Sequence, residues 1–125
     1  MKRGTFVLTP FPFSDLTTTK RRPAVIVSSA DENEVVVAFI TSQPHKATRP
    51  TDLIIETSYP DFAATGLKKA SAIRLHKLCT IEKSIIYGEI GEASPTLISE
   101  INRRLRLALE LDEPASSDKD AVVLP

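Results

Sequence analysis

Two runs of apolar, mostly β-branched residues, separated by a short polar segment, place the strongest limit on how this chain folds. The first is Val25-Ile26-Val27, and the second, over residues 34–42, reads EVVVAFITS. Successive apolar residues fit a strand covered on both faces, because a half-exposed strand alternates polar with apolar residues. Between the runs, Asp31-Glu32-Asn33 ends in an asparagine that tolerates a left-handed backbone. The pattern therefore predicts a central antiparallel hairpin over residues 22–29 and 34–42.

A basic cluster opens the first of these strands. Lys20, Arg21 and Arg22 precede Pro23, which suits a first strand position because no ladder hydrogen bond is needed there. The proline also holds Arg22 extended, so its guanidinium lies at a fixed edge of the sheet, as an anion site requires. Antiparallel pairing then brings Thr41-Ser42 back beside Arg22. Alternatively, the cluster is only the solvated rim of a turn, as charge runs usually are.

The rest of the chain predicts further short strands and one terminal helix. Strands are expected at residues 4–9, 51–57, 71–81 and 85–91, with a helical turn closed by Gly66. The helix takes Ser94 as its N-cap and Pro95 at its first position, carries an apolar stripe, and ends at Pro114. Short strands with turn signals and one helix favour a mainly β fold, a small β-barrel with a helical plug.

Length and composition favour one cytoplasmic domain. The chain has 125 residues, of which 42% are hydrophobic, enough for a single core. No segment approaches the ~20 apolar residues that a membrane span needs, so we expect no membrane partner. The single Cys79 excludes an internal disulfide framework and a cysteine metal cluster, and a structural thiol is expected. Residues 1–112 are expected to form the domain, and residues 113–125 a disordered acidic tail.

Charge is balanced overall but unevenly placed. Sixteen basic and sixteen acidic residues cancel. Residues 1–30 nevertheless hold five basic residues and one acidic residue, whereas residues 110–125 hold five acidic residues and one basic residue. This polarity is compatible with a phosphate-binding face near the start of the chain. The neutral total argues against non-specific duplex binding as the main function, because that binding grows with the number of neutralised phosphates.

Two loops add candidates for a nucleic-acid site. The loop at residues 43–50 carries His45, Lys46 and Arg49, and a histidine beside a phosphate site titrates near neutral pH. A lone loop histidine is nevertheless more often a solvated surface residue. The segment Pro10-Phe11-Pro12-Phe13 ends the first strand. Phe11 and Phe13 are either core residues at that strand end or platforms on which bases stack.

Short motifs occur in a defined order along most of the chain. They are Gly4-x-x-Val7-Leu8-x-Pro10-Phe11-Pro12-Phe13-Ser14-Asp15-Leu16, Lys20-Arg21-Arg22-Pro23-Ala24-Val25-Ile26-Val27-Ser28, Ile40-Thr41-Ser42-Gln43, Gly66-Leu67-Lys68-Lys69-Ala70-Ser71 and Leu75-x-Lys77-Leu78-x-Thr80-Ile81-Glu82-Lys83-Ser84. Together they resemble the PemK and MazF family of toxins from bacterial toxin–antitoxin pairs, over residues 4 to about 111. The resemblance implies an SH3-like β-barrel with a C-terminal α-helix. It also implies a homodimer that cuts single-stranded RNA without a metal or other cofactor, and a cognate antitoxin that covers the substrate groove.

The resemblance also implies site residues. Arg22, before the strand-opening proline, and Thr41, closing the next strand, match the family's catalytic pair, and residues 14–21 match the loop that flanks the substrate channel. Phe11 or Phe13 is the candidate for base stacking. The other candidate RNA-binding residues are Lys20, Arg21, Ser42, Gln43, His45, Lys46 and Arg49.

The implied reaction is attack of the RNA 2′-hydroxyl on its neighbouring phosphate, which expels the 5′-oxygen and leaves a 2′,3′-cyclic phosphate. The substrate supplies the nucleophile, so the work left to the protein is electrostatic: Arg22 binds transition-state oxygens and Thr41 donates a hydrogen bond. Two alternatives stay open. One is a toxin of the same barrel type that poisons DNA gyrase through its terminal helix, and the other is a catalytically silent nucleic-acid-binding module.

Overall fold

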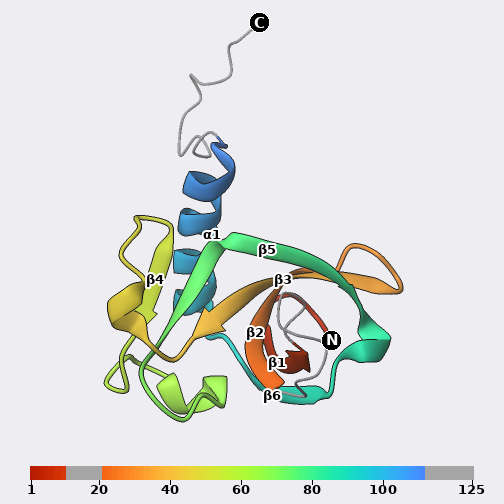
Figure 1. The fold of residues 1–125 in the computed structure, drawn as a ribbon, viewed down its shortest axis with the longest axis horizontal. Coiled ribbons are helices and arrows are strands. Elements are labelled where there is room, and N and C mark those ends of the chain that lie inside the picture. Colours follow the sequence, from red (N-terminus) through yellow and green to blue (C-terminus); the bar gives the residue numbers. More distant parts are fainter. Residues whose placement is uncertain (11–20, 112–125) are drawn as a thin grey trace, which may run out of the picture.

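The computed structural model describes residues 1–10 and 21–111, and its strands form one curled antiparallel sheet followed by a helix (Figure 1). The sheet order is β4-β5-β3-β2-β1-β6. The strands are β1 (Thr5–Pro10), β2 (Arg21–Ser28), β3 (Glu34–Thr41), β4 (Asp52–Ile55), β5 (Ser71–Glu82) and β6 (Gly88–Glu92). Three 3₁₀ turns, η1 (Pro44–Lys46), η2 (Phe62–Thr65) and η3 (Lys83–Ile85), and the helix α1 (Pro95–Leu109) complete it. The predicted mainly β class, a small barrel-like sheet with a C-terminal helix, is confirmed.

The central hairpin forms as the apolar runs predict. Strands β2 and β3 pair antiparallel, with Ala24 opposite Phe39 and Val25 opposite Ala38. Side chains alternate between two cores, so that Val25 enters one and Ala24 the other. Both faces of the hairpin are therefore covered, which is why neither run alternates with polar residues.

The two cores lie on opposite faces of the curled sheet. One is closed by α1, whose Leu97 and Ile101 are buried against it. The other is the interior of the curl, around which β5 arches in Figure 1. Its buried members are Val7, Ala24, Ile26, Val35, Val37, Phe39 and Ile81, with the half-buried Cys79 packed against them. The curl thus makes an interior whose open end can hold polar side chains.

A bulge in β5 bends this strand around the interior. The β3–β5 register runs from Ala38 opposite Leu78 directly to Phe39 opposite Arg74. The residues between, Leu75-His76-Lys77, therefore have no direct partners on β3, and such an insertion bends a strand and increases its twist. The bulge explains why apolar and polar residues alternate imperfectly over residues 71–81. It also sets the positions of Arg74 and Lys77.

Some predicted boundaries were wrong, and the strand predicted at residues 51–57 is the shorter β4. Helix α1 begins as expected, with Ser94 Oγ accepting from the Leu97 N–H at 3.2 Å. It ends at Leu109 rather than at Pro114, because Glu110 turns left-handed at φ 57° and caps the helix. The last strand begins at Gly88 rather than at residue 85, because η3 ends at Ile85. The predicted helical turn closed by Gly66 is confirmed as η2.

Several predictions fall on residues that the structure does not describe. These are the loop with Phe11, Phe13 and Lys20, and the tail at residues 113–125. Within the two described ranges, the helix is too short and too polar to cross a membrane.

Candidate active site

Arg22 and Thr41 lie in one row at the open end of the curled interior. On one side Arg22 is opposite Thr9 of β1, a buried residue. On the other side the β2–β3 register has Ala24 opposite Phe39. Continued by two residues along each strand, this register sets Arg22 opposite Thr41. Directly opposed residues of antiparallel strands share a face. The predicted hairpin geometry thus brings a guanidinium and a hydroxyl to the same face of the sheet.

The two side chains line one pocket of about 180 Å³. Phe39 and Ile40 of β3 and Arg74 and Lys77 of β5 form the rest of its wall. Three cationic side chains surround one hydroxyl, against the single carboxylate of Asp52 beside Arg74, so the charges at the pocket are mainly positive and suit an anion. In the part of the chain that the structure describes, no three His, Cys, Asp or Glu side chains come together as a possible metal site.

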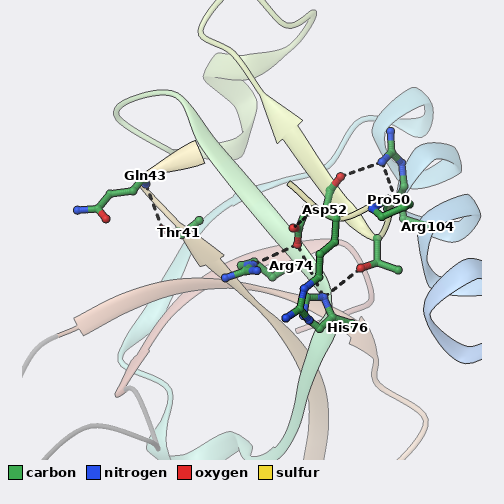
Figure 2. A network of polar contacts seen from close by, with 9 residues as sticks. Thr41, Gln43, Pro50, Asp52, Arg74, His76 and Arg104 are labelled. Carbon is green, nitrogen blue, oxygen red and sulfur yellow. Dashed lines mark hydrogen bonds and ion pairs between the residues drawn. The ribbon is translucent and has the colours of Figure 1, made fainter. Parts of the chain in front are cut away.

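The Thr41 hydroxyl is held by a backbone hydrogen bond that leaves its proton available. Its Oγ1 accepts from the Gln43 N–H at 3.1 Å (Figure 2). A hydroxyl that accepts a hydrogen bond can still donate its own proton. The backbone of Gln43 therefore helps to orient Thr41, although the Gln43 side chain is exposed and does not line the pocket.

Arg74 and Lys77 are pocket residues that the sequence pattern did not indicate. Their positions depend on the β3–β5 register and on the bulge, neither of which can be read from local spacing. The Arg74 Nε donates to Asp52 Oδ1 at 3.1 Å, and Asp52 is 3% exposed (Figure 2). The Asp52 Oδ2 accepts from the backbone N–H of Arg49 at 3.0 Å. The pocket thus has a cation supported by a buried carboxylate.

The structure does not place the loop candidates in this pocket. His45 and Arg49 line a separate hollow of about 500 Å³ together with Arg104, and Lys46 is exposed at the end of η1. The Arg49 side chain is engaged with His76 Nε2 through its Nη1. Contact of His45, Lys46 and Arg49 with RNA stays a prediction, and it concerns the surface outside the Arg22–Thr41 pocket.

Arg21 and Ser42 lie on a third hollow. It measures about 330 Å³ and is also lined by Lys68 and Lys69. The Arg21 guanidinium lies 4.4 Å from the ring centroid of Tyr87, a cation–π contact. Arg21 and Arg22 are successive residues of one strand, so their side chains point to opposite faces. Lys68 and Lys69 belong to one of the quoted motifs, but they were not among the predicted site residues.

His76 connects the loop to the bulge and should make stability depend on pH. Its Nδ1 lies 3.0 Å from Thr51 Oγ1, and its Nε2 accepts from Arg49, so the ring is neutral. Burial lowers the pKa of His76 from its ordinary value of 6.5, and the positive charge of Arg49 lowers it further, against the opposing effect of Asp52. The unfolded chain therefore takes up this proton first as the pH falls below 6.5.

We expect the free energy of unfolding to fall as the pH is lowered from the pKa of His76 in the unfolded chain to its lower pKa in the folded protein. In His76→Gln that part of the decline should be absent. Urea unfolding from about pH 7.5 to about pH 5 measures the difference between the two proteins. His45→Gln provides the matched control for loss of a solvent-exposed imidazole. Parallel pH curves for wild type and His76→Gln would contradict the assignment.

Comparison with known proteins decides the family. The sequence model of the family described as "PemK-like, MazF-like toxin of type II toxin-antitoxin system" matches residues 2–109. The chain belongs to this family. A curated relative, the endoribonuclease MazF6 of Mycobacterium tuberculosis, is 28% identical over 97 residues, which span 74% of this PemK/MazF-like chain and 81% of the relative.

Solved structures agree on the PemK/MazF-like fold. An endoribonuclease of a mycobacterial species, solved with its cognate antitoxin, has a TM-score of 0.68 and 23% identity, covering 91% of this chain and 99% of that one. A MazE–MazF complex of Deinococcus radiodurans has a TM-score of 0.65 and 15% identity, covering 90% and 97%. The family predicted from the motifs is confirmed, and so is the fold.

Proposed function

We propose that this PemK/MazF-like toxin is an endoribonuclease that cleaves single-stranded RNA in the pocket of Arg22 and Thr41. The observation that carries the proposal is the shared row of these two residues in a pocket walled by two further cations. Family membership and the name of the curated relative support the same activity. RNA sequence is read chiefly on unpaired strands, whose bases can be splayed into a groove.

The chemistry follows from what the pocket contains. The RNA 2′-oxygen forms a bond to the neighbouring phosphorus while the bond to the 5′-oxygen breaks, leaving a 2′,3′-cyclic phosphate and a 5′-hydroxyl. The 2′-hydroxyl proton passes to solvent, and solvent returns one proton to the 5′-oxygen, so that the step balances. Negative charge grows on the phosphoryl oxygens during this step, and Arg22 stabilises it by a forked pair of hydrogen bonds. A guanidinium is a poor proton-transfer group, so the role that we assign to Arg22 is electrostatic.

The two other hollows are suited to the flanking nucleotides. The one with Arg21, Ser42, Lys68 and Lys69 is positively charged, as is the one with Arg49 and His45 near Lys46. Phosphate contacts of this kind position a strand without reading its sequence. We assign these residues to holding the RNA on either side of the scissile phosphate, with Lys20 and Phe11 or Phe13 added from the loop.

We further propose that the toxin is bound by a cognate antitoxin, that it forms a homodimer, and that it acts in the cytoplasm. Two solved neighbours are complexes of a toxin with its antitoxin. We assign to these partners part of the large apolar side chains that are exposed among the described residues. These side chains are Met1, Ile54, Ile85, Tyr87, Leu107, Leu109 and Leu111.

The activity is tested by incubating the purified protein with a long RNA in EDTA and mapping the ends. We expect discrete cuts, with 2′,3′-cyclic phosphate on the upstream fragments and 5′-hydroxyl on the downstream fragments. Uncut RNA together with inhibition of DNA gyrase would instead identify a topoisomerase poison. RNA binding without cuts would identify a silent binding module. Either result overturns the proposed function.

A further inference from the structure

We propose that Arg74 is a second phosphate-binding cation of the Arg22–Thr41 pocket, and that the buried Asp52 is the positioning residue that aims it. The inference rests on the proposed RNA cleavage and adds a substrate contact and its support. Arg74 lines the pocket together with Arg22 and Thr41. Its side chain is 19% exposed, whereas that of Asp52 is 1% exposed. The cation is thus reachable from the pocket, and the carboxylate that holds it is enclosed.

The hydrogen bond between the two leaves most of the guanidinium available. Arg74 uses its Nε to donate to Asp52 Oδ1 at 3.1 Å. Its terminal nitrogens make no hydrogen bond to any residue within 1–10 and 21–111. A guanidinium carries five donors in a rigid planar fork, so fixing the Nε also fixes the direction of the other donors. In Figure 2 Arg74 lies between Asp52 and Thr41.

The carboxylate is itself held from several sides. Asp52 is opposite Arg74 in the β4–β5 register, and its Oδ2 accepts from the backbone N–H of Arg49 at 3.0 Å. Arg104 of α1 donates from Nη1 to the Asp52 carbonyl at 2.8 Å and to the Pro50 carbonyl at 2.7 Å. Backbone and helix therefore fix Asp52 before any substrate binds. This is the arrangement that a preorganised electrostatic site needs, because its donors do not reorganise during the reaction.

Asp52→Asn is expected to disturb this support. The amide has one acceptor and one donor end, but Asp52 accepts from Arg74 on one oxygen and from the Arg49 N–H on the other. One of these N–H groups must then face the NH₂ end of the asparagine. Arg74 loses its fixed direction although it keeps its charge. Arg74→Gln removes the charge itself.

The test compares wild type, Arg74→Gln, Asp52→Asn and the double variant, with Lys2→Gln as the control for loss of one exposed cation. All are first checked for a cooperative thermal transition. Single-turnover cleavage of a long RNA should slow by about 10²-fold for Arg74→Gln and by about tenfold for Asp52→Asn. If Asp52 acts through Arg74, Asp52→Asn costs nothing further in the Arg74→Gln background. Equal losses in both backgrounds would overturn the positioning role.

Binding measured on a fully 2′-O-methyl RNA separates this inference from the proposed cleavage, because that RNA cannot be cut. The slope of log affinity against log salt should be about 0.7 shallower for Arg74→Gln and unchanged for Lys2→Gln. An unchanged slope for Arg74→Gln would overturn the phosphate contact, whether or not wild type cleaves RNA. If wild type fails to cleave but the slopes differ as expected, only the proposed chemistry falls.

Arg74→Lys covers the case in which Asp52→Asn does not fold. Lysine keeps the charge, but its single ammonium cannot hold Asp52 and reach into the pocket at once. We expect a rate close to that of Asp52→Asn, in which the charge is also kept and the direction lost, with the wild-type salt slope largely retained. Wild-type cleavage by Arg74→Lys would show that the direction of the guanidinium is irrelevant, and would overturn the role of Asp52.

Discussion

Arg22→Ala should lower the rate of RNA cleavage by about 10²- to 10³-fold while the protein stays folded. The reason is the place of Arg22 in the sheet. It follows Arg21 at the start of β2, next to Pro23, and is opposite the buried Thr9. Its backbone is held by pairing, whereas its guanidinium faces the pocket with Thr41. Removing it takes away the forked donor that stabilises the phosphorane-like transition state.

Single-turnover cleavage of an RNA panel measures the effect, and thermal unfolding checks the fold. Arg103→Ala is the matched control, because Arg103 is an exposed residue of α1 paired with Glu100 and does not line the pocket. It should leave the rate unchanged. Expression in a bacterial host should be toxic for wild type and for Arg103→Ala, and non-toxic for Arg22→Ala. Full cleavage of the panel by Arg22→Ala would remove Arg22 from the site.

The central hairpin and its row of polar residues could be predicted from the sequence, because local constraints decide them. Two apolar runs joined by a short polar segment can bury both faces only as neighbouring strands, and antiparallel pairing then fixes which ends meet. Arg22 and Thr41 are therefore brought to one face by the register of β2 and β3 alone. Their roles in catalysis remain a prediction.

The remainder of the pocket could not be predicted, because it depends on contacts between distant segments. Arg74 and Lys77 reach it through the bulge of β5, and the alternation in that strand gave only an ambiguous signal. Asp52 looks like an ordinary strand-edge acid in the sequence, yet it is buried as the partner of Arg74. The charge of the loop with Arg49 predicts RNA binding, which stays a prediction, but that charge does not indicate that the Arg49 backbone N–H binds Asp52 or that its guanidinium contacts His76. Charge in a sequence thus does not say whether a cation faces solvent or a neighbour.

Gly66→Ala is expected to destabilise the protein more than any other change considered so far. Gly66 caps η2 in the left-handed region at φ 77°, which L side chains rarely adopt. A Cβ built there would lie 2.0 Å from the carbonyl oxygen of Ile90 in β6, a backbone atom that cannot move aside alone. Strain and overlap combine, so we expect a loss of more than about 4 kcal/mol. Urea unfolding with circular dichroism measures it.

Gly88→Ala is the matched control, because Gly88 lies in β6, the strand that Gly66 approaches. A Cβ at Gly88 meets no atom within 4 Å, and its φ lies outside the left-handed range. Its free energy of unfolding should stay within about 0.5 kcal/mol of wild type. The contrast tests the close approach of η2 to β6, which sets the course of the chain into Lys68 and Lys69. Similar stabilities for Gly66→Ala and Gly88→Ala would contradict that approach, and with it the wall that we assign to flanking RNA.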